Sequence, residues 1–153
     1  MKRMVSIARA LKEKNRVAGR LAKARQLVGK ENSKEKKVPR GVDVKAAYAE
    51  AKTLRDRLVA IKTAIAVANQ PIVGKIVELA EVKSEIAYLN TLNVQEGVFE
   101  EPSYVGKLVK EYDAVLKKAE VLAEVNALQR RADELQDALD EFNASVKVEI
   151  EVD

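Results

Sequence analysis

The chain has 153 residues, of which 47% are hydrophobic and only 4% aromatic, and it contains no Cys, His or Trp. This length suits one domain, and Ala, Val, Leu and Ile must fill its core, as in helical bundles and coiled coils. The missing residue types exclude disulfides, thiolate or imidazole catalysis and the usual zinc sites. No apolar run reaches the about 18 residues of a membrane-spanning helix.

The N-terminal residues 1–16 are basic but lack the apolar run of about 7–15 residues that marks a secretory signal. Together with the absence of Cys, this favours a cytoplasmic protein. A helix lying on a membrane surface is also not expected, because no Trp or Phe anchors the basic N-terminal segment.

The net charge of +4 conceals a strong asymmetry along the chain. Residues 1–40 carry 14 Lys or Arg and 3 Asp or Glu, whereas residues 41–153 carry 14 and 21. The basic part can pair with the acidic remainder of this chain or of a neighbouring subunit. Alternatively, it leaves a basic surface free for an anionic partner.

The first predicted helix covers residues 3–31, and a basic linker follows over residues 32–42. Lys14 and Arg25 interrupt the apolar face of this helix, and the linker contains Pro39 and Gly41. The apolar face recurs at steps that suit one side of a helix: Met4, Ile7, Leu11, Ala18, Leu21 and Val28.

The second predicted helix covers residues 43–68, with Asp43 as its N-cap. Its two-position apolar seam comprises Val44, Ala47, Ala51, Leu54, Leu58, Ile61, Ile65 and Ala68. Pro71 removes a backbone donor and clashes with the preceding turn, yet the apolar phase continues beyond it. We expect two helices, 43–68 and 71–91, with one kinked helix as the alternative.

A loop with Gly97 and Pro102 is predicted over residues 92–102, followed by a last helix over residues 103–143. Its seam changes phase between Leu122 and Leu128, which indicates a local overwinding of the supercoil. Asn126 beside this point either fixes the register of the seam or is simply exposed, and we favour the exposed position. The seam comprises Val105, Leu108, Tyr112, Val115, Ala119 and Leu122, then Val125, Leu128, Ala132, Leu135, Leu139 and Phe142.

The last residues, 145–152, alternate apolar and charged side chains and predict a β-strand. Its apolar side chains, which we expect at an interface between subunits, are Val146, Val148, Ile150 and Val152. Antiparallel self-pairing across a two-fold axis would place Lys147 near Glu149 or Glu151 of the other copy. Pairing within the chain, with residues 94–99 or 37–44, is the alternative. The predicted fold is therefore mainly all-α, an elongated antiparallel helical bundle or coiled coil with a short C-terminal strand, in a single domain 1–153.

The sequence offers little for catalysis. No glycine-rich phosphate loop is present, and the His of a di-metal carboxylate bundle is missing. We interpret the acidic runs around Glu81 and Asp137 as solvated helix faces. No enzyme activity, metal, cofactor or small-molecule substrate is therefore expected, and an enzyme built on bundle carboxylates remains a distant alternative.

The basic N-terminal segment supplies the candidate nucleic-acid-binding residues, which are Lys12, Arg16, Arg20, Lys23, Lys36, Lys37 and Arg40. Such a basic surface suits phosphate binding. However, no aromatic residues are interleaved to stack bases, and no known DNA-binding motif is present. Pairing with acidic groups of the protein itself is the favoured alternative.

Four segments carry a resemblance to a known family: ALKEKNRVAGRLAK, LVAIKTAIAVAN, IVELAEVKSEIAYLNTL and LQRRADELQDALDEFNASVKVEI. They resemble the septicolysin-like family of small helical proteins, which also occur in phage-related settings. The family pattern ends a long helix with an Asn and a short strand, here Asn143 and Val146, but Ala144 replaces the aromatic residue expected after the Asn. The resemblance implies a soluble bacterial or phage-related homo-oligomer without an established reaction. A cytolysin, which the family name implies, has no support in the residues.

We therefore expect a non-catalytic structural or interaction protein that forms a coiled-coil-rich homo-oligomer. A nucleic-acid-binding module that uses the basic N-terminal helix and linker is the alternative.

Overall fold

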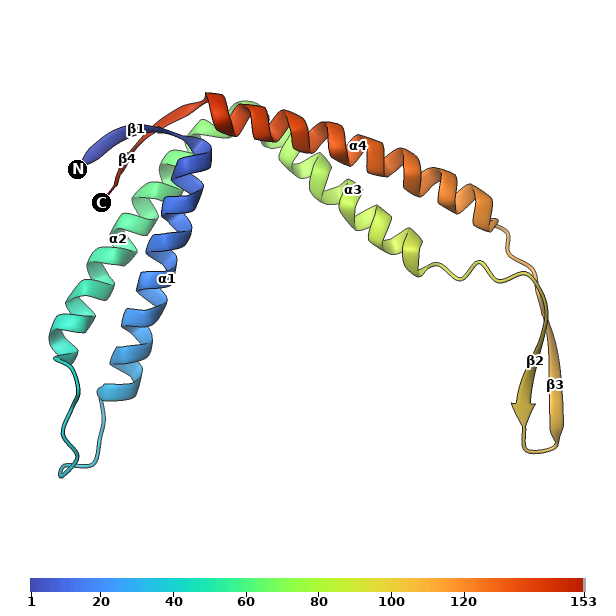
Figure 1. The fold of residues 1–153 in the computed structure, drawn as a ribbon, viewed down its shortest axis with the longest axis horizontal. Coiled ribbons are helices and arrows are strands. Elements are labelled where there is room, and N and C mark those ends of the chain that lie inside the picture. The colour runs from blue at the N-terminus through green and yellow to red at the C-terminus, as the bar shows by residue number, and fades with distance from the viewer. Residues whose placement is uncertain (153) are drawn as a thin grey trace. The chain divides into compact units, whose positions relative to one another are not determined.

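The computed structural model describes residues 1–152, which are mainly helical with short antiparallel strands (Figure 1). Contacts divide the chain into two compact units, where the sequence predicts one domain. The terminal unit comprises residues 1–73 and 140–152, and the central unit comprises residues 74–139. The elements are β1 (Lys2–Ser6), α1 (Ile7–Glu31), α2 (Val44–Ala68), the 3-10 turn η1 (Gln70–Ile72), α3 (Val73–Thr91), β2 (Gly97–Ser103), β3 (Gly106–Tyr112), α4 (Lys118–Ser145) and β4 (Lys147–Glu151).

In the terminal unit, the two ends of the chain form an antiparallel ribbon. β1 pairs with β4 from Lys2 opposite Glu151 to Ser6 opposite Lys147. Beyond the strands, the Val152 N–H donates to the Met1 carbonyl and the Ile7 N–H donates to the Val146 carbonyl, each at 3.0 Å. The ladder therefore satisfies those backbone groups of β4 that face β1.

The predicted C-terminal strand is confirmed, and it pairs within the chain, which is the alternative to self-pairing between subunits. Its partner is residues 2–6, so the two predicted intrachain partners, residues 94–99 and residues 37–44, are wrong. Val148, Ile150 and Val152 are buried in the core of the terminal unit, and the half-buried Val146 packs against it, so these side chains do not form an exposed interface. This partner strand lies where the sequence predicts the start of the first helix, over residues 3–6.

The first helix begins four residues later than predicted, because Ser6 is its N-cap. The Ser6 Oγ accepts a hydrogen bond from the Arg9 N–H at 3.3 Å and so satisfies one free donor of the first turn. Met4, placed on the helix face by its spacing from Ile7, instead lies in β1 and is 61% exposed. The short strand is easily missed because two of its five residues are basic.

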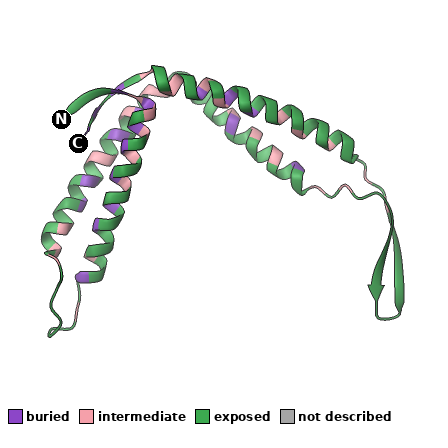
Figure 2. Ribbon diagram, viewed as in Figure 1, coloured by how far each residue is buried: buried purple, intermediate pink, exposed green. Residues whose placement is uncertain are grey.

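α1 and α2 pack against each other and against β4 to form the core of the terminal unit. Ile7 and Val17 of α1 and Ile61 of α2 are almost completely buried, and Figure 2 shows the buried positions of both helices. Every member of the predicted α2 seam is buried or half-buried, so this prediction is confirmed. Burial of a Leu or Ile side chain contributes roughly 1.5–3 kcal/mol, which makes this seam the main stabilising feature.

The predicted interruption at Pro71 is also confirmed as a break between two helices. α2 ends at Ala68, and the Asn69 N–H still donates to the Ile65 carbonyl at 2.9 Å. Pro71 lies in the first turn of the 3-10 segment, where its missing N–H leaves no helical hydrogen bond unmade. α3 then starts at Val73.

A buried carboxylate joins three elements of the terminal unit. Glu13 lies on the buried face of α1 and is only 8% exposed. Its Oε1 accepts a hydrogen bond from Arg57 of α2 at 2.5 Å, and both carboxylate oxygens accept from Arg16, at 2.7 and 3.0 Å. Arg57 also donates to the Glu151 carbonyl in β4 at 3.2 Å. The charge of Glu13 is therefore compensated inside the unit.

The central unit contains a β-hairpin where the sequence predicts the start of the last helix. β2 and β3 pair from Gly97 opposite Tyr112 to Ser103 opposite Gly106. The helical interpretation of residues 103–117 is wrong because Val105, Leu108 and Tyr112 fit a helical spacing by chance, whereas Pro102 and Gly106 break a helix. Gly106 has φ +124°, which a residue with a side chain rarely adopts.

α3 and α4 complete the central unit, and an ion pair joins them. Arg131 of α4 donates to both carboxylate oxygens of Glu78 in α3, at 2.7 and 3.0 Å. Asn126 is exposed, as predicted. The buried or half-buried face of α4 in this unit follows a regular seam without a change of phase, formed by Val121, Val125, Leu128, Ala132, Leu135 and Leu139.

We expect Glu13→Gln to lower the free energy of unfolding by about 3 kcal/mol, because it removes the nearly buried carboxylate charge that Arg57 and Arg16 both bind. Urea denaturation followed by circular dichroism measures this loss. Glu50→Gln is the matched control, because it removes an exposed partner of Arg20 and should cost less than about 1 kcal/mol. Equal losses in the two variants would contradict the role assigned to Glu13.

Candidate functional site

Charge is distributed unequally between the two units. Counted in the sequence with Asp153 included, the terminal unit contains 20 Lys or Arg and 11 Asp or Glu, and the central unit contains 8 and 13. Their formal charges are therefore +9 and −5. An anionic partner is attracted to the terminal unit, and a cationic one to the central unit.

The four predicted nucleic-acid-binding residues of α1 lie on one side of that helix, together with two further basic residues. At about 100° per residue they fall within an arc of roughly 80°, and all of them are exposed. We call this surface the basic stripe, and it comprises Arg9, Lys12, Arg16, Arg20, Lys23 and Lys30. Arg9 and Lys30 are not among the predicted candidates, although the basic residues Arg9, Arg16, Lys23 and Lys30 recur in the sequence at seven-residue intervals.

The cations of the basic stripe differ in their partners. Arg16 binds Glu13, and Arg20 binds Glu50 at 3.1 Å. Within residues 1–152, neither Lys12 nor Lys23 is paired with a carboxylate. The stripe therefore combines compensated arginines with lysines that are available to an external anion.

The other three predicted binding residues lie in the loop between α1 and α2. Lys36 and Lys37 are exposed there. Arg40 instead donates to the carbonyls of Glu31 and Asn32, at 3.0 and 3.2 Å, and so binds the free C-terminal end of α1. The structure thus assigns Arg40 a local structural contact and leaves Lys36 and Lys37 apart from the stripe.

Glu31 holds the same loop in place. Its carboxylate accepts hydrogen bonds from the Lys34 Nζ at 2.8 Å and from the Gly41 N–H at 3.0 Å. The hydrogen bond from Lys34, with a second from Gly41, lowers the pKa of Glu31. Both ends of the loop are therefore fixed to the C-terminus of α1.

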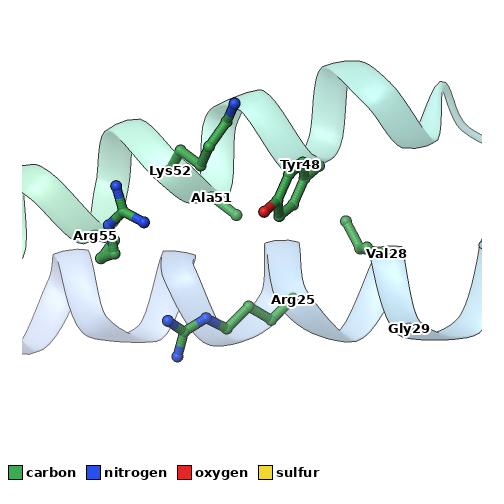
Figure 3. A pocket seen from close by; sticks show the side chains of 7 residues that line it. All are labelled: Arg25, Val28, Gly29, Tyr48, Ala51, Lys52 and Arg55. Carbon is green, nitrogen blue, oxygen red and sulfur yellow. The ribbon is translucent and has the colours of Figure 1, made fainter.

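A groove of about 310 Å³ lies between α1 and α2 (Figure 3). Tyr48 and Val28 face each other across it, while the charged ends of Lys52 and Arg25 point to opposite sides. Lys52 lies over the Tyr48 ring, 5.1 Å from its centroid. Because the cations diverge, the groove provides an apolar contact surface and not a converging anion site.

The β2–β3 hairpin exposes apolar side chains on both faces, and we call residues 97–112 the hairpin surface. One face carries Val98 and Val109, and the other carries Phe99, Leu108 and Tyr112. The Phe99 and Tyr112 rings meet edge to face with centroids 5.6 Å apart. Figure 2 shows both strands exposed along nearly their whole length. No other layer of the described chain buries this ribbon.

Ion pairs stiffen the hairpin surface and its base. Lys107 binds Glu100 at 2.7 Å, and Lys110 binds Glu101 at 2.6 Å, which raises the pKa of Lys110. Lys117, just beyond the hairpin, binds Glu96 before it and Asp113 after it. The hydrogen bond that the Lys117 ammonium donates to Glu96 is the largest cause of the raised pKa of Lys117. These contacts connect the two segments of the chain that enter and leave the hairpin.

The acidic runs of the central unit are solvent-facing or engaged in ion pairs. Glu78 binds Arg131, and the hydrogen bond from this guanidinium lowers the pKa of Glu78. Within residues 1–152, no three carboxylates gather closely enough to form a metal site. In the same range, no helix has both the length and the apolar character needed to cross a membrane.

No protein-family model, curated protein or solved structure matches this chain. The septicolysin-like resemblance therefore stays an expectation.

We expect Glu31 to make stability depend on pH. Its pKa is lowered in the folded state, so its contribution is present above the pKa of the unfolded chain and is lost as the pH falls through the folded pKa. The difference in free energy of unfolding between wild type and Glu31→Gln should therefore shrink on acidification. Glu35→Gln, an exposed change in the same loop, is the control. A difference that stays constant from neutral to acid pH would disprove this linkage.

Proposed function

We propose that this chain is a non-catalytic structural or interaction protein that assembles into a coiled-coil-rich homo-oligomer, built on an elongated antiparallel helical bundle. The observation that carries the proposal is the hairpin surface. A two-stranded hairpin is marginally stable by itself in water, and here every residue of the strands except Tyr112 is exposed. A partner that covers the ribbon would supply the missing stabilisation.

Further exposed apolar residues extend this argument to the helices of the central unit. Val77 and Tyr88 of α3 and Leu122 of α4 are each 56% exposed. Apolar side chains that gather on a surface mark contact sites for other proteins. Coiled-coil contacts between copies would cover these residues and continue the seams that α3 and α4 bury only in part.

A second copy of the chain is the partner that the charges favour. The terminal unit is formally +9 and the central unit −5. Oppositely charged units on two copies attract each other, which assists association and selects among orientations. The absence of His and Cys and the ion pairing of Glu78 support the non-catalytic part of the proposal.

Nucleic-acid binding is the second candidate, and the basic stripe is the observation that favours it. The stripe spans residues 9–30 of α1, roughly 30 Å at 1.5 Å per residue. A cationic row of this length suits a run of backbone phosphates. The lack of aromatic residues beside the stripe favours contacts with phosphates and disfavours base stacking.

Sedimentation equilibrium at micromolar concentration tests the first proposal. We expect a mass that is a multiple of the 16.9 kDa chain, because association buries the apolar residues of the central unit. A homogeneous species of single-chain mass across the concentration range would overturn the homo-oligomer.

Fluorescence anisotropy with a labelled RNA duplex of about 20 base pairs tests the second candidate. Binding should weaken steeply with salt, and the double variant K12E/K23E should lower the slope of log K against log salt by about 2. The double variant K45E/K62E makes the same charge change on α2 and should keep the slope. Absence of binding at low salt, or equal effects of the two double variants, would eliminate this candidate.

A further inference from the structure

The two outer edges of the β2–β3 hairpin expose different backbone groups. The turn consists of Tyr104 and Val105, and Ser103 pairs with Gly106. In a two-residue turn this closing pair exchanges hydrogen bonds, and such pairs then alternate with pairs whose backbone groups point outward. On β3 the outward groups belong to Lys107, Val109 and Glu111. On β2 they belong to Val98, Glu100 and Pro102.

The outer edge of β2 is poorly suited to pairing. Pro102 has no N–H, so this edge lacks one of its donors. Glu100 occupies the middle of the edge, and a two-fold axis there would place Glu100 opposite its own copy. Like charges directly opposite each other destabilise a sheet. β2 therefore carries the features that protect an edge strand from other chains.

The outer edge of β3 has none of these protective features in the matching positions. Lys107, Val109 and Glu111 all retain an N–H, and their side chains share one face of the ribbon. Antiparallel pairing with a second β3 about a two-fold axis at Val109 places Val109 opposite Val109 of the second copy. It also places Lys107 opposite Glu111 of the second copy, and the symmetry repeats this contact. Opposite charges therefore meet twice in one register.

The same register completes a larger sheet. Its strand order would be β2, β3, and then β3 and β2 of the second copy, with the proline-bearing edges outermost. A sheet of four strands has the support that a two-stranded hairpin lacks. On the other face, the Phe99, Leu108 and Tyr112 side chains of both copies would form one apolar surface.

We infer that the outer edge of β3 is a docking surface for the β3 strand of a second copy of this chain, in the register centred on Val109. This inference rests on the proposed homo-oligomer and specifies one of its contacts. Complementary charge indicates that a second copy is the partner. A two-fold axis at Val109 places Lys107 of each copy opposite Glu111 of the other.

Proline substitution of the full-length chain tests the edge itself. Val109→Pro removes an N–H from the outer edge of β3 and leaves the ladder between β2 and β3 intact. Val98→Pro is the matched control, because it removes an N–H from the outer edge of β2 and also leaves that ladder intact. Sedimentation velocity over a concentration series should show self-association weakened at least about tenfold by V109P and little changed by V98P. Equal behaviour of both variants and wild type would overturn the inference while leaving an oligomeric wild type in place.

Charge reversal tests the register of the two β3 strands. It also distinguishes a lost contact from misfolding, because a second charge reversal should restore the contact. K107E and E111K should each weaken self-association by about tenfold, because each turns two attractive pairs into repulsive ones. The double variant K107E/E111K should restore it. K110E is the control, because it also breaks an ion pair within the hairpin but changes a residue whose backbone faces β2.

The outcomes separate this inference from the proposed function. A monomeric wild type would overturn the homo-oligomer and with it the docking of β3. An oligomeric wild type whose association is not restored in K107E/E111K would overturn the Val109-centred register alone. Restoration in the double variant, with V109P impaired, supports both.

Discussion

The ion pair between Glu13 and Arg57 connects the three elements that form the core of the terminal unit. Glu13 stands in the middle of the apolar face of α1, where an uncompensated carboxylate would be strongly destabilising. Arg57 comes from α2 and also reaches the Glu151 carbonyl in β4. A buried charge is stable only where its hydrogen-bond partners surround it, so this contact favours one alignment of α1, α2 and β4. Val and Ile side chains fill the space around it.

The two units use their apolar residues differently. In the terminal unit, the ribbon of β1 and β4 covers the α1–α2 core with Val5, Val148 and Ile150. In the central unit, β2 and β3 carry comparable side chains that nothing in the described chain buries. The contrast favours an assembly function, because one unit is complete by itself and the other presents surface that association would cover.

Local periodicity explains which predictions are confirmed. The α2 seam, the break at Pro71, the exposed Asn126 and the C-terminal strand all depend on residues close in sequence. The hairpin at residues 97–112 differs from the predicted helix because Val105, Leu108 and Tyr112 satisfy a helical spacing, although Val105 lies in the turn and only Leu108 and Tyr112 lie in β3. Among the candidate binding residues, Lys12, Arg16, Arg20 and Lys23 share one stripe, whereas Arg40 binds the end of α1, a role that its position in a basic run does not reveal.

The sequence by itself determined the mainly helical character, the positions of α2 and β4 and the basic character of the N-terminal helix. These properties follow from composition and from repeats of two, three and four residues. Only the tertiary structure decided that Lys2 lies opposite Glu151, that Glu13 meets Arg57 and that β2 and β3 form an uncovered ribbon. Such contacts join residues that are distant in sequence. They also decide whether a segment whose apolar spacing suits a helix forms a strand instead. These contacts depend on how the whole chain packs, and local sequence patterns do not carry that information.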